Sequence, residues 1–526
     1  MTVDEETTET AGDLSALLSS ATLMLFLGSL GSLSRLLERI AMGQLLSPSA
    51  YGEVSIAFSM LSVASTLALA GFTKGIARFM TRFDRESDIR GVWVTGSAIG
   101  AVLTVLVTVL FLSNVERLAD RLFEPSTPPE LLLVFVATIP FFAGMKLVVA
   151  GIRGCENTIY RTYSRDLLFN GLRLLMVVGL LLAGYGVVAM GFAYLISALA
   201  AFFVALWLFN RLLPIVGAFE THTREILVFS LPLVLSSVVT MFLSEIDTLM
   251  IGYYLPSSQA GIYSAAWPLA RGIGVIVSSF GFLFLPLMSR LDASERRGEV
   301  NRMYEVTTKW VFVVSFPALL CLTVFADDLI SSVFGAEYTA GASALTILAL
   351  GSFTSASFGR CQDTLSAFGY TSYIFGINAV AGVLNVVLNA VLIGGYGPVP
   401  QLGIDGAALA TTASTVTLNG SALAVLWYKS GVNPLSRWTV RAFLLLPATL
   451  FPPALVLAGR ATLSLPALIV FVVVTGIASI AVLAVTNSLQ PEDEIPVSLI
   501  EDKLGVSIPL IRRYIPNESD RQDELP

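Results

Sequence analysis

Long apolar runs alternate with short polar connections along most of the chain. Sliding hydropathy divides the runs into fourteen stretches of about 20 residues or more, the length that an α-helix needs to cross a bilayer. The stretches lie near residues 15–41, 52–73, 91–113, 130–152, 165–184, 187–209, 225–251, 260–289, 309–333, 341–368, 371–394, 404–428, 439–459 and 463–486. The pattern predicts an all-α polytopic membrane protein with about 14 transmembrane helices.

The composition agrees, because 55% of the 526 residues are hydrophobic and only 13% are charged, against about 25% charged in globular proteins. Three widely spaced cysteines (Cys155, Cys321, Cys361) exclude a disulfide framework and a CxxC ligand pair. The single histidine, His222, leaves zinc and haem without ligands. We therefore expect no cofactor and no metal, and the net charge of −7 argues against a nucleic-acid partner.

The distribution of Lys and Arg predicts the orientation, because short loops rich in these residues stay in the cytoplasm. With the N-terminus inside, 22 cations fall in inner loops and the tail, and only Arg117, Arg121 and Arg460 fall outside. Both termini of this multi-pass protein are thus expected in the cytoplasm. Residues 1–14 carry no Lys or Arg, so they lack the positive region of a secretory signal, and the first span should be retained.

The sequence also predicts an internal repeat, and chance similarity between apolar segments rich in Leu, Gly and Ala is the alternative. A shift of 209 residues sets GQLLSPSAYGEVSIA (43–57) on GYYLPSSQAGIYSAA (252–266), and it brings Glu38 onto Asp247. The motif at 184–186 recurs at 395–397. Six spans separate each pair, so the copies run in the same direction, as in transporters whose halves are related by a pseudo-twofold axis along the membrane normal.

The repeat defines six segments of the chain. They are an acidic cytoplasmic tail (1–14), an N-terminal six-helix lobe (15–209), a cytoplasmic linker (210–224), a C-terminal six-helix lobe (225–428), two extra transmembrane helices (439–486) and a cytoplasmic tail (487–526). The last tail contains an apolar segment broken by Gly505 and Pro509, which we expect at the membrane interface.

Four stretches resemble one family. They are DTLMIGYYLP (247–256) with AGIYSAA (260–266), LLSPSAYG (45–52), FGAEY (334–338) with LALG (348–351), and GIDGAALAT (403–411). In this order they are similar to the polysaccharide-export flippases of the multidrug/oligosaccharidyl-lipid/polysaccharide exporter superfamily. The resemblance implies a transporter that turns polyprenyl phosphate- or diphosphate-linked oligosaccharides to the outer leaflet by alternating access. Its partners would be the lipid-linked glycan, the bilayer, an ion gradient of protons or sodium, and glycan-assembly enzymes.

Charged residues inside the spans give an independent argument. Each costs at least about 2.5–3.5 kcal/mol at bilayer depth, so such residues normally face a bundle interior or a cavity. The candidate substrate-binding cations are Arg35, Arg39, Lys146, Arg173, Arg271 and Arg360. The candidate gating or ion-coupling anions are Glu38, Glu245, Asp247 and Asp363. The excess of cations favours a phosphate, which Arg binds in a bidentate manner.

Local pairing is the alternative interpretation of these charges. Arg35 is three residues from Glu38, and Arg360 is three residues from Asp363, so each pair shares a helical face. Lys146, Arg173 and Arg271 have no opposite charge within four positions of the same span. Their partners must come from other helices or from the substrate, and Arg271 is the first candidate because it lies in the middle of a span of the second repeat.

Uncharged polar residues are dense in three later spans. Span 12 carries Thr411, Thr412, Ser414, Thr415, Thr417 and Asn419, span 10 carries Ser352, Thr354, Ser355 and Ser357, and span 11 carries Asn378, Asn385 and Asn389. These groups suit a glycan, but small polar residues also hold membrane helices together. We favour the packing interpretation.

The absence of certain motifs narrows the function. No G-x-x-x-x-G-K-[ST] loop occurs, so the protein is not expected to hydrolyse ATP, and we predict that it is not an enzyme. A drug or organic-cation antiporter of the same superfamily is the first alternative, and it would depend on buried carboxylates. A membrane polysaccharide polymerase is the second, but it would need a larger extramembrane loop than the longest outer one, 114–129.

Overall fold

The computed structural model describes residues 30–69, 71–125, 127–279, 284, 288–290, 297–494 and 515. These residues form helices and connecting turns without a β-strand, and eleven of the helices are long and apolar enough to cross a membrane. The prediction of an all-α polytopic membrane protein is confirmed. The chain divides into two compact units, residues 1–264 and 265–526, which are described separately.

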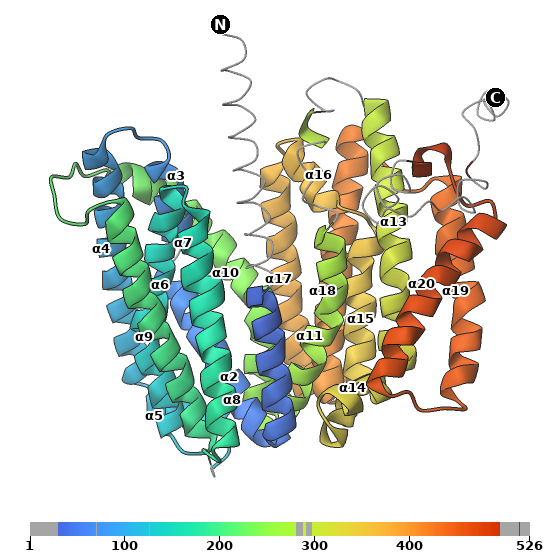
Figure 1. Ribbon diagram of the computed structural model, residues 1–526, viewed down its shortest axis with the longest axis horizontal. Helices are drawn as coiled ribbons and strands as arrows, with labels where there is room; N and C mark the ends of the chain where they lie inside the picture. The colour runs from blue at the N-terminus through green and yellow to red at the C-terminus, as the bar shows by residue number, and fades with distance from the viewer. Residues whose placement is uncertain are drawn as a thin grey trace, which may run out of the picture. The chain divides into compact units, whose positions relative to one another are not determined.

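Among the described residues of the first unit, residues 30–45 are helical. Its further elements are α2 (Pro48–Leu69), α3 (Phe72–Met80), α4 (Glu86–Leu112), α5 (Val115–Leu122), α6 (Glu130–Gly154), α7 (Thr158–Thr162), a π-helical segment (Tyr163–Phe169), α8 (Asn170–Leu182), α9 (Val187–Leu212), α10 (Thr223–Tyr254) and the start of α11 (Ser257–Ser279). Helix α6 is central, because it packs against α9, α2, α3 and α4 (Figure 1). Trp93 of α4 and Phe209 of α9, with ring centroids 4.7 Å apart, belong to this buried core.

The connection between α9 and α10 lies across the start of α4. The buried Arg90 guanidinium donates hydrogen bonds to the carbonyl oxygens of Pro214 and Ala218, each at 2.7 Å. The His222 ring nitrogen Nε2 lies 3.0 Å from Asp88 Oδ1. The linker predicted from the sequence is therefore held against α4 by specific polar contacts.

The starts of α2 and α11 cross at two glycines that the repeat makes equivalent. A Cβ atom on Gly52 would lie 1.7 Å from the Ser257 carbonyl oxygen, and one on Gly261 would lie 1.9 Å from the Pro48 carbonyl oxygen. The 209-residue shift turns each contact into the other, and such reciprocity is typical of a twofold relation. Only glycine allows the two backbones to approach so closely.

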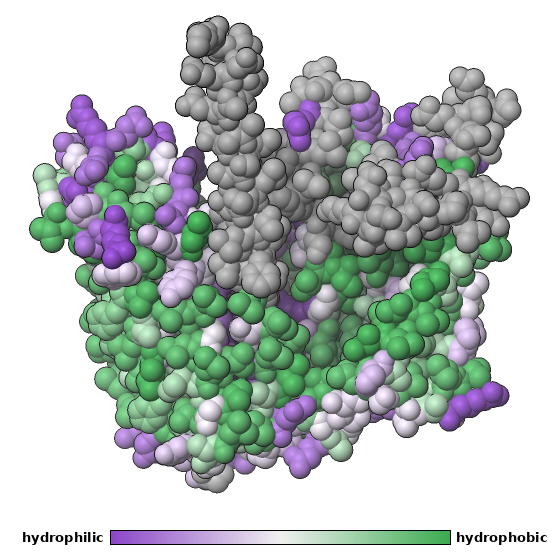
Figure 2. Space-filling model, viewed as in Figure 1, coloured by the Kyte–Doolittle hydropathy of each residue, from purple (hydrophilic) through white to green (hydrophobic). Residues whose placement is uncertain are grey.

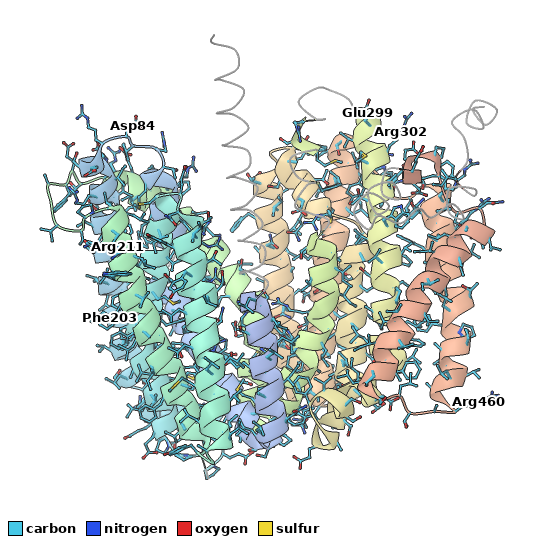
Figure 3. The ribbon with its side chains drawn as sticks, viewed as in Figure 1. Asp84, Phe203, Arg211, Glu299, Arg302 and Arg460 are labelled. Carbon is cyan, nitrogen blue, oxygen red and sulfur yellow. The ribbon has the colours of Figure 1, made fainter. Side chains whose placement is uncertain are left out.

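The second unit contains the rest of α11 and the later helices. They are α13 (Arg297–Val324), α14 (Ala326–Val333), a 3₁₀ helix (Ala336–Gly341), α15 (Ala342–Ser357), α16 (Cys361–Ala367), α17 (Thr371–Gly394), α18 (Gly403–Ser430), α19 (Arg437–Ala458), α20 (Leu465–Val485) and a short 3₁₀ turn (Pro491–Asp493). Helix α18 packs against α15 and α17, and α13 packs against α15, α19 and α20. Figure 3 places Glu299 and Arg302 at one end of this unit and Arg460 at the other.

Two predicted spans are divided in the structure. The stretch 341–368 forms α15 and α16 because Gly359, with φ of +73°, ends the first helix before the second begins. The stretch 309–333 forms the end of α13 and the separate α14, whose first turn carries Asp327 and Asp328, as suits a helix N-terminus. The helix that corresponds to the predicted span 165–184 begins earlier, at Thr158, because α7 and the π-helical segment lead directly into α8.

Both units present apolar side chains around the middle of their helices. Figure 2 shows hydrophobic residues over the middle of the visible face of each unit and hydrophilic residues towards the helix ends. Many of these apolar side chains are exposed, among them Val105, Leu106, Ile469 and Val473, each at about 60% or slightly less. An apolar surface of this kind is what lipid tails cover.

The 3₁₀ turn after α20 is fastened to α13 by a buried ion pair. Lys309 Nζ lies 2.5 Å from Asp493 Oδ2, and Trp310 Nε1 donates to Asp493 Oδ1 at 2.8 Å. Both charged side chains are fully buried. The predicted acidic tail 1–14 and the apolar tail segment around Gly505 and Pro509 lie outside the described residues.

Candidate functional site

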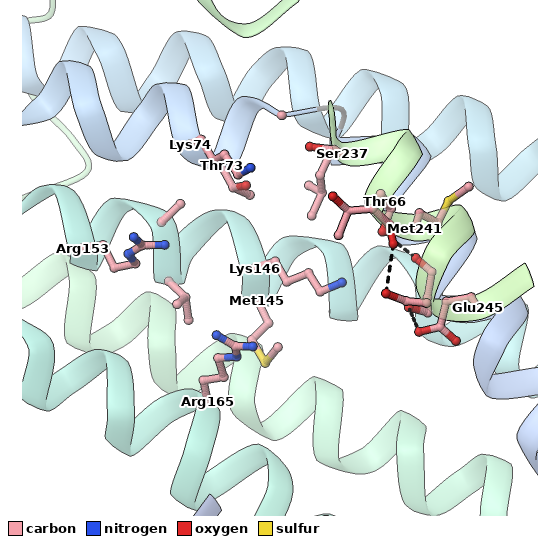
Figure 4. A pocket seen from close by; sticks show the side chains of 17 residues that line it. Thr66, Thr73, Lys74, Met145, Lys146, Arg153, Arg165, Ser237, Met241 and Glu245 are labelled. Carbon is pink, nitrogen blue, oxygen red and sulfur yellow. Dashed lines mark hydrogen bonds between the residues drawn. The ribbon is translucent and has the colours of Figure 1, made fainter. Parts of the chain in front are cut away.

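The first unit contains a cavity of about 380 Å³, bounded by α2, α3, α6, α10 and the π-helical segment (Figure 4). Its lining residues are Ser62, Thr66, Leu69, Gly71, Thr73, Lys74, Met145, Lys146, Val149, Ala150, Arg153, Arg165, Ser237, Thr240, Met241, Ser244 and Glu245. Four of these side chains are cationic and one is anionic. The cavity therefore has a net positive lining.

Three elements supply the four cations. Lys74 comes from α3, Lys146 and Arg153 come from α6, and Arg165 comes from the π-helical segment. Lys146 and Arg153 are seven residues apart, about two helical turns, so they share one face of α6. A π-helical segment changes the direction of the side chains after it and is frequent at functional sites. Together they form what we call the cationic wall.

Lys146 is held in position by neighbours on α2 and α6. Its Nζ donates to Ser65 Oγ at 2.8 Å and lies 4.2 Å from the centroid of the Phe142 ring. The hydroxyl and the ring fix one side of the ammonium group, and the cavity receives the other. An ammonium group has three donors, so Lys146 keeps capacity for an acceptor in the cavity.

Helices α2 and α10 form the remaining wall. It carries the hydroxyl groups of Ser62, Thr66, Ser237, Thr240 and Ser244 and the carboxylate of Glu245. Ser62 Oγ donates to Glu245 Oε1 at 3.1 Å. Figure 4 shows Ser237, Thr66 and Glu245 across the cavity from Arg153 and Lys74. We call this surface the hydroxyl wall.

Two candidates from the sequence form a buried ion pair next to this region. Arg173 of α8 donates through Nε and Nη2 to Glu38 Oε2, at 2.8 and 2.5 Å. The guanidinium carbon also lies 4.8 Å from the ring centroid of Phe169 and 4.7 Å from that of Tyr194. Both charged side chains are almost fully buried. This pair joins the helix over residues 30–45 to α8.

The other candidates of the first unit have different surroundings. Arg35 is exposed, and its Nη2 donates to Ser32 Oγ at 2.9 Å. Arg39 is partly buried and interacts electrostatically with Glu245. Asp247 is buried and accepts a hydrogen bond from the Tyr263 hydroxyl at 2.7 Å.

The remaining candidates lie in the second unit and do not line the cavity. Arg271 stacks on Trp267, with its guanidinium carbon 3.9 Å from the ring centroid. Arg360 forms an ion pair with Asp363 and donates to the Val277 carbonyl oxygen at 2.5 Å. The pairing of Arg360 with Asp363 is the one that their spacing allows within a single helical turn.

Sequence reasoning missed three residues of the cationic wall. Lys74, Arg153 and Arg165 are among the 22 cations of the predicted inner loops, where their position indicates only the orientation of the chain. The structure brings them to one cavity with the candidates Lys146 and Glu245. The available signal was the polar interruption around Arg165 and Asp166 next to an apolar run, but it did not distinguish a loop from a helix with a π-helical segment.

A family of known proteins matches much of the chain. The model of the family described as polysaccharide biosynthesis protein matches residues 41–343, which is more than half of the sequence. The chain belongs to the polysaccharide biosynthesis protein family. Membership of this family confirms the resemblance carried by the stretches between residues 45 and 411.

A sequence relative and a solved structure that resemble this chain both carry the name flippase. The chain is 24% identical over 354 residues to the Haloferax volcanii protein named Probable flippase AglR, covering 66% of this chain and 70% of AglR. The solved structure of the lipid II flippase MurJ in an inward closed conformation matches with a TM-score of 0.66 at 14% identity, over 88% of this chain and 98% of MurJ.

A second solved structure is that of a multidrug resistance MATE family transporter of the MOP superfamily in an inward-facing conformation. It matches with a TM-score of 0.62 at 17% identity, over 78% of this chain and 99% of that one. At these identities the two structures show a shared fold. The chain is therefore a polysaccharide biosynthesis family member with the fold of MOP-superfamily transporters.

Proposed function

We propose that the protein is a flippase that moves a polyprenyl phosphate- or diphosphate-linked oligosaccharide across the cytoplasmic membrane by alternating access. The product would serve the synthesis of surface polysaccharide or glycoprotein. Family membership, the flippase name of AglR and the fold shared with MurJ support this role. The named relatives are transporters, which favours transport over catalysis.

The cationic wall is the observation that carries the proposal. Among the described residues, Lys74, Lys146, Arg153 and Arg165 line one cavity together with a single carboxylate, that of Glu245. An Arg guanidinium presents paired donors that match phosphate oxygens, and an ammonium group adds a compact charge. Such a cavity attracts an anionic lipid headgroup from the inner leaflet and holds it away from the apolar phase.

The same wall argues against the antiporter alternative. The MATE fold allows a drug or organic-cation antiporter, but a cavity lined by four cations repels a cationic ligand. An organic cation also needs aromatic faces or several carboxylates around it. The described residues of the lining supply one carboxylate and no aromatic ring.

Further features belong to the proposal. Residues 15–209 and 225–428 would be the two lobes, joined by 210–224, with both termini in the cytoplasm and helices 439–486 added at the end. Arg271 would contact the phosphate from the second lobe. An ion gradient, or consumption of the glycan on the outer side, would supply the energy.

Reconstitution tests the proposal directly. Proteoliposomes containing the purified protein and a polyprenyl diphosphate-linked disaccharide would be assayed for transfer of the sugar between leaflets. We expect the unaltered protein to accelerate transfer, and Lys146→Ala or Arg165→Ala to reduce the rate at least tenfold, because each removes a charge-assisted contact to phosphate.

Arg460→Ala serves as the matched control, because Arg460 is an exposed cation outside the cavity. It should transport like the unaltered protein. Normal transfer by both Lys146→Ala and Arg165→Ala, with all variants inserted at equal levels, would contradict the proposed role of the cationic wall.

A further inference from the structure

The cavity has two chemically different walls. Figure 4 shows Lys74 and Arg153 on one side and Ser237, Thr66 and Glu245 on the other. A phosphate satisfies the cationic wall but is repelled by the Glu245 carboxylate. The hydroxyl wall therefore suits a different part of the ligand, one that is neutral and carries many hydrogen-bond donors and acceptors.

Sugar rings have this chemistry. Each ring hydroxyl donates one hydrogen bond and accepts others, and a carboxylate accepts from two neighbouring hydroxyls at once. Three of the wall's hydroxyls already donate within the protein, Ser62 to Glu245 and Thr66 and Ser244 to main-chain carbonyl oxygens. Their oxygens therefore offer acceptors to the hydroxyl groups of a ligand. A wall that combines five such hydroxyls with one carboxylate matches a sugar ring better than a phosphate or an alkyl chain.

The charges of Lys146 and Glu245 are held apart rather than joined in an ion pair. In the part of the chain that the structure describes, no ion pair joins Lys146 to Glu245. Instead Lys146 donates to Ser65 and Glu245 accepts from Ser62, two serines three residues apart on α2. Both charges are thereby fixed in place and remain able to bind a ligand, so less freedom is lost on binding.

From this arrangement we infer that the hydroxyl wall is a subsite for the sugar attached directly to the phosphate, and that Glu245 selects this sugar. The inference rests on the proposed flippase function and adds a specificity determinant to it. A cavity of about 380 Å³ is near the lower end of the roughly 300–1,000 Å³ of small-molecule sites, which fits a headgroup rather than a long glycan. The remaining sugars would lie outside this subsite.

Binding of two matched lipids tests the inference. The full-length protein in nanodiscs would be titrated with polyprenyl phosphate and with polyprenyl phosphate-glucose. We expect the glucosylated lipid to bind more tightly to the unaltered protein. Glu245→Gln should weaken its binding about tenfold, because hydrogen bonds to a charged acceptor are lost. The same variant should bind polyprenyl phosphate as well as before or better, because a repelling charge is removed.

One control and two further variants of the wall accompany Glu245→Gln. Glu116→Gln removes an exposed carboxylate of α5 and should change neither affinity. Ser244→Ala and Thr240→Val probe the hydroxyl wall without altering its charge. Each should weaken the binding of the glucosylated lipid by a few-fold and leave the binding of polyprenyl phosphate unchanged. These variants keep the test decisive if Glu245→Gln fails to fold.

The outcomes separate the inference from the proposed function. Equal affinity of the unaltered protein for the two lipids, or equal weakening of both by the variants of the hydroxyl wall, would overturn the sugar subsite. Arg165→Ala should weaken the binding of both lipids to the same extent. If Arg165→Ala and Lys146→Ala leave both affinities unchanged, the phosphate site of the proposed function fails instead.

Discussion

The helices around the cavity of the first unit and helices α15, α17 and α18 of the second unit use different polar chemistry, and the buried Lys309–Asp493 pair of the second unit lies outside those three helices. The first unit buries charges, with Arg173 paired to Glu38 and Lys146 and Glu245 at a cavity. In the second unit, α15, α17 and α18 are joined by neutral groups. Asn419 Nδ2 donates to Thr354 and Ser355 at 3.2 and 3.1 Å, and Asn385 Nδ2 donates to Thr411 at 3.3 Å.

The difference separates two uses of polar residues in a membrane. Amides and hydroxyls satisfy one another between helices at small cost, which is ordinary helix packing. Charges cost more at this depth and are retained where a ligand or a necessary contact compensates them. The buried charges near the cavity of the first unit therefore indicate where function lies, whereas the hydroxyl-rich helices of the second unit agree with the packing interpretation.

The largest effect is expected from breaking the charged pair of the first unit. Arg173→Ala leaves Glu38 buried without its cation, which should lower the free energy of unfolding by about 3–5 kcal/mol. Titration with sodium dodecyl sulfate would measure the change. Arg211→Ala removes an exposed cation stacked on Trp207 and should have little effect.

The double variant Glu38→Gln/Arg173→Met sharpens this result. It removes both charges, so it should be more stable than Arg173→Ala. If the double variant is the less stable of the two, the cost does not come from an uncompensated charge.

A smaller effect is expected where the two copies of the repeat meet. Gly52→Ala and Gly261→Ala each force a Cβ atom against a carbonyl oxygen, and overpacking of this kind costs about 1–3 kcal/mol. The reciprocal contacts predict losses of similar size for the two variants in the same denaturation assay. Gly179→Ala is the control, because a Cβ atom added to Gly179 would have no contact within 4 Å apart from its chain neighbours and the backbone of its own helix. A large loss for only one glycine would contradict the symmetry.

The smallest effect is expected in the neutral network of the second unit. Asn419→Ala removes hydrogen bonds between α18 and α15, and such bonds contribute about 0.6 kcal/mol on average in membrane proteins. The amide of Asn378 donates to the Ile374 carbonyl of its own helix, so Asn378→Ala should cost less. Loss of several kcal/mol in Asn419→Ala would remove the contrast between the two units.

Hydropathy was sufficient to predict the helices, because each span needs a continuous apolar run that the sequence displays directly. The repeat was visible because several spaced residues recur 209 positions later: Leu46, Ser49, Gly52, Ser55 and Ala57 as Leu255, Ser258, Gly261, Ser264 and Ala266. The breaks within spans were harder to predict. At Gly359 a positive φ ends the helix, and a glycine in an apolar run does not by itself reveal that conformation.

The site could be predicted only in part. Lys146 and Glu245 were candidates because each interrupts an apolar run, whereas Lys74, Arg153 and Arg165 lie where ordinary cytoplasmic loops also carry cations. Arg173 and Glu38 are 135 residues apart, so no local spacing could join them. Which charges share a cavity is decided by the packing of α2, α3, α6 and α10, which a single sequence does not specify.

The central claim is that the cationic wall of the first unit binds a lipid phosphate. A cryo-electron microscopy structure of the protein in nanodiscs with bound polyprenyl phosphate-glucose tests it most directly. We predict phosphate density within hydrogen-bonding distance of Lys146 and Arg165, and sugar density against the hydroxyl wall next to Glu245. Phosphate density bound elsewhere, with the cavity of the first unit free of lipid, would contradict the account.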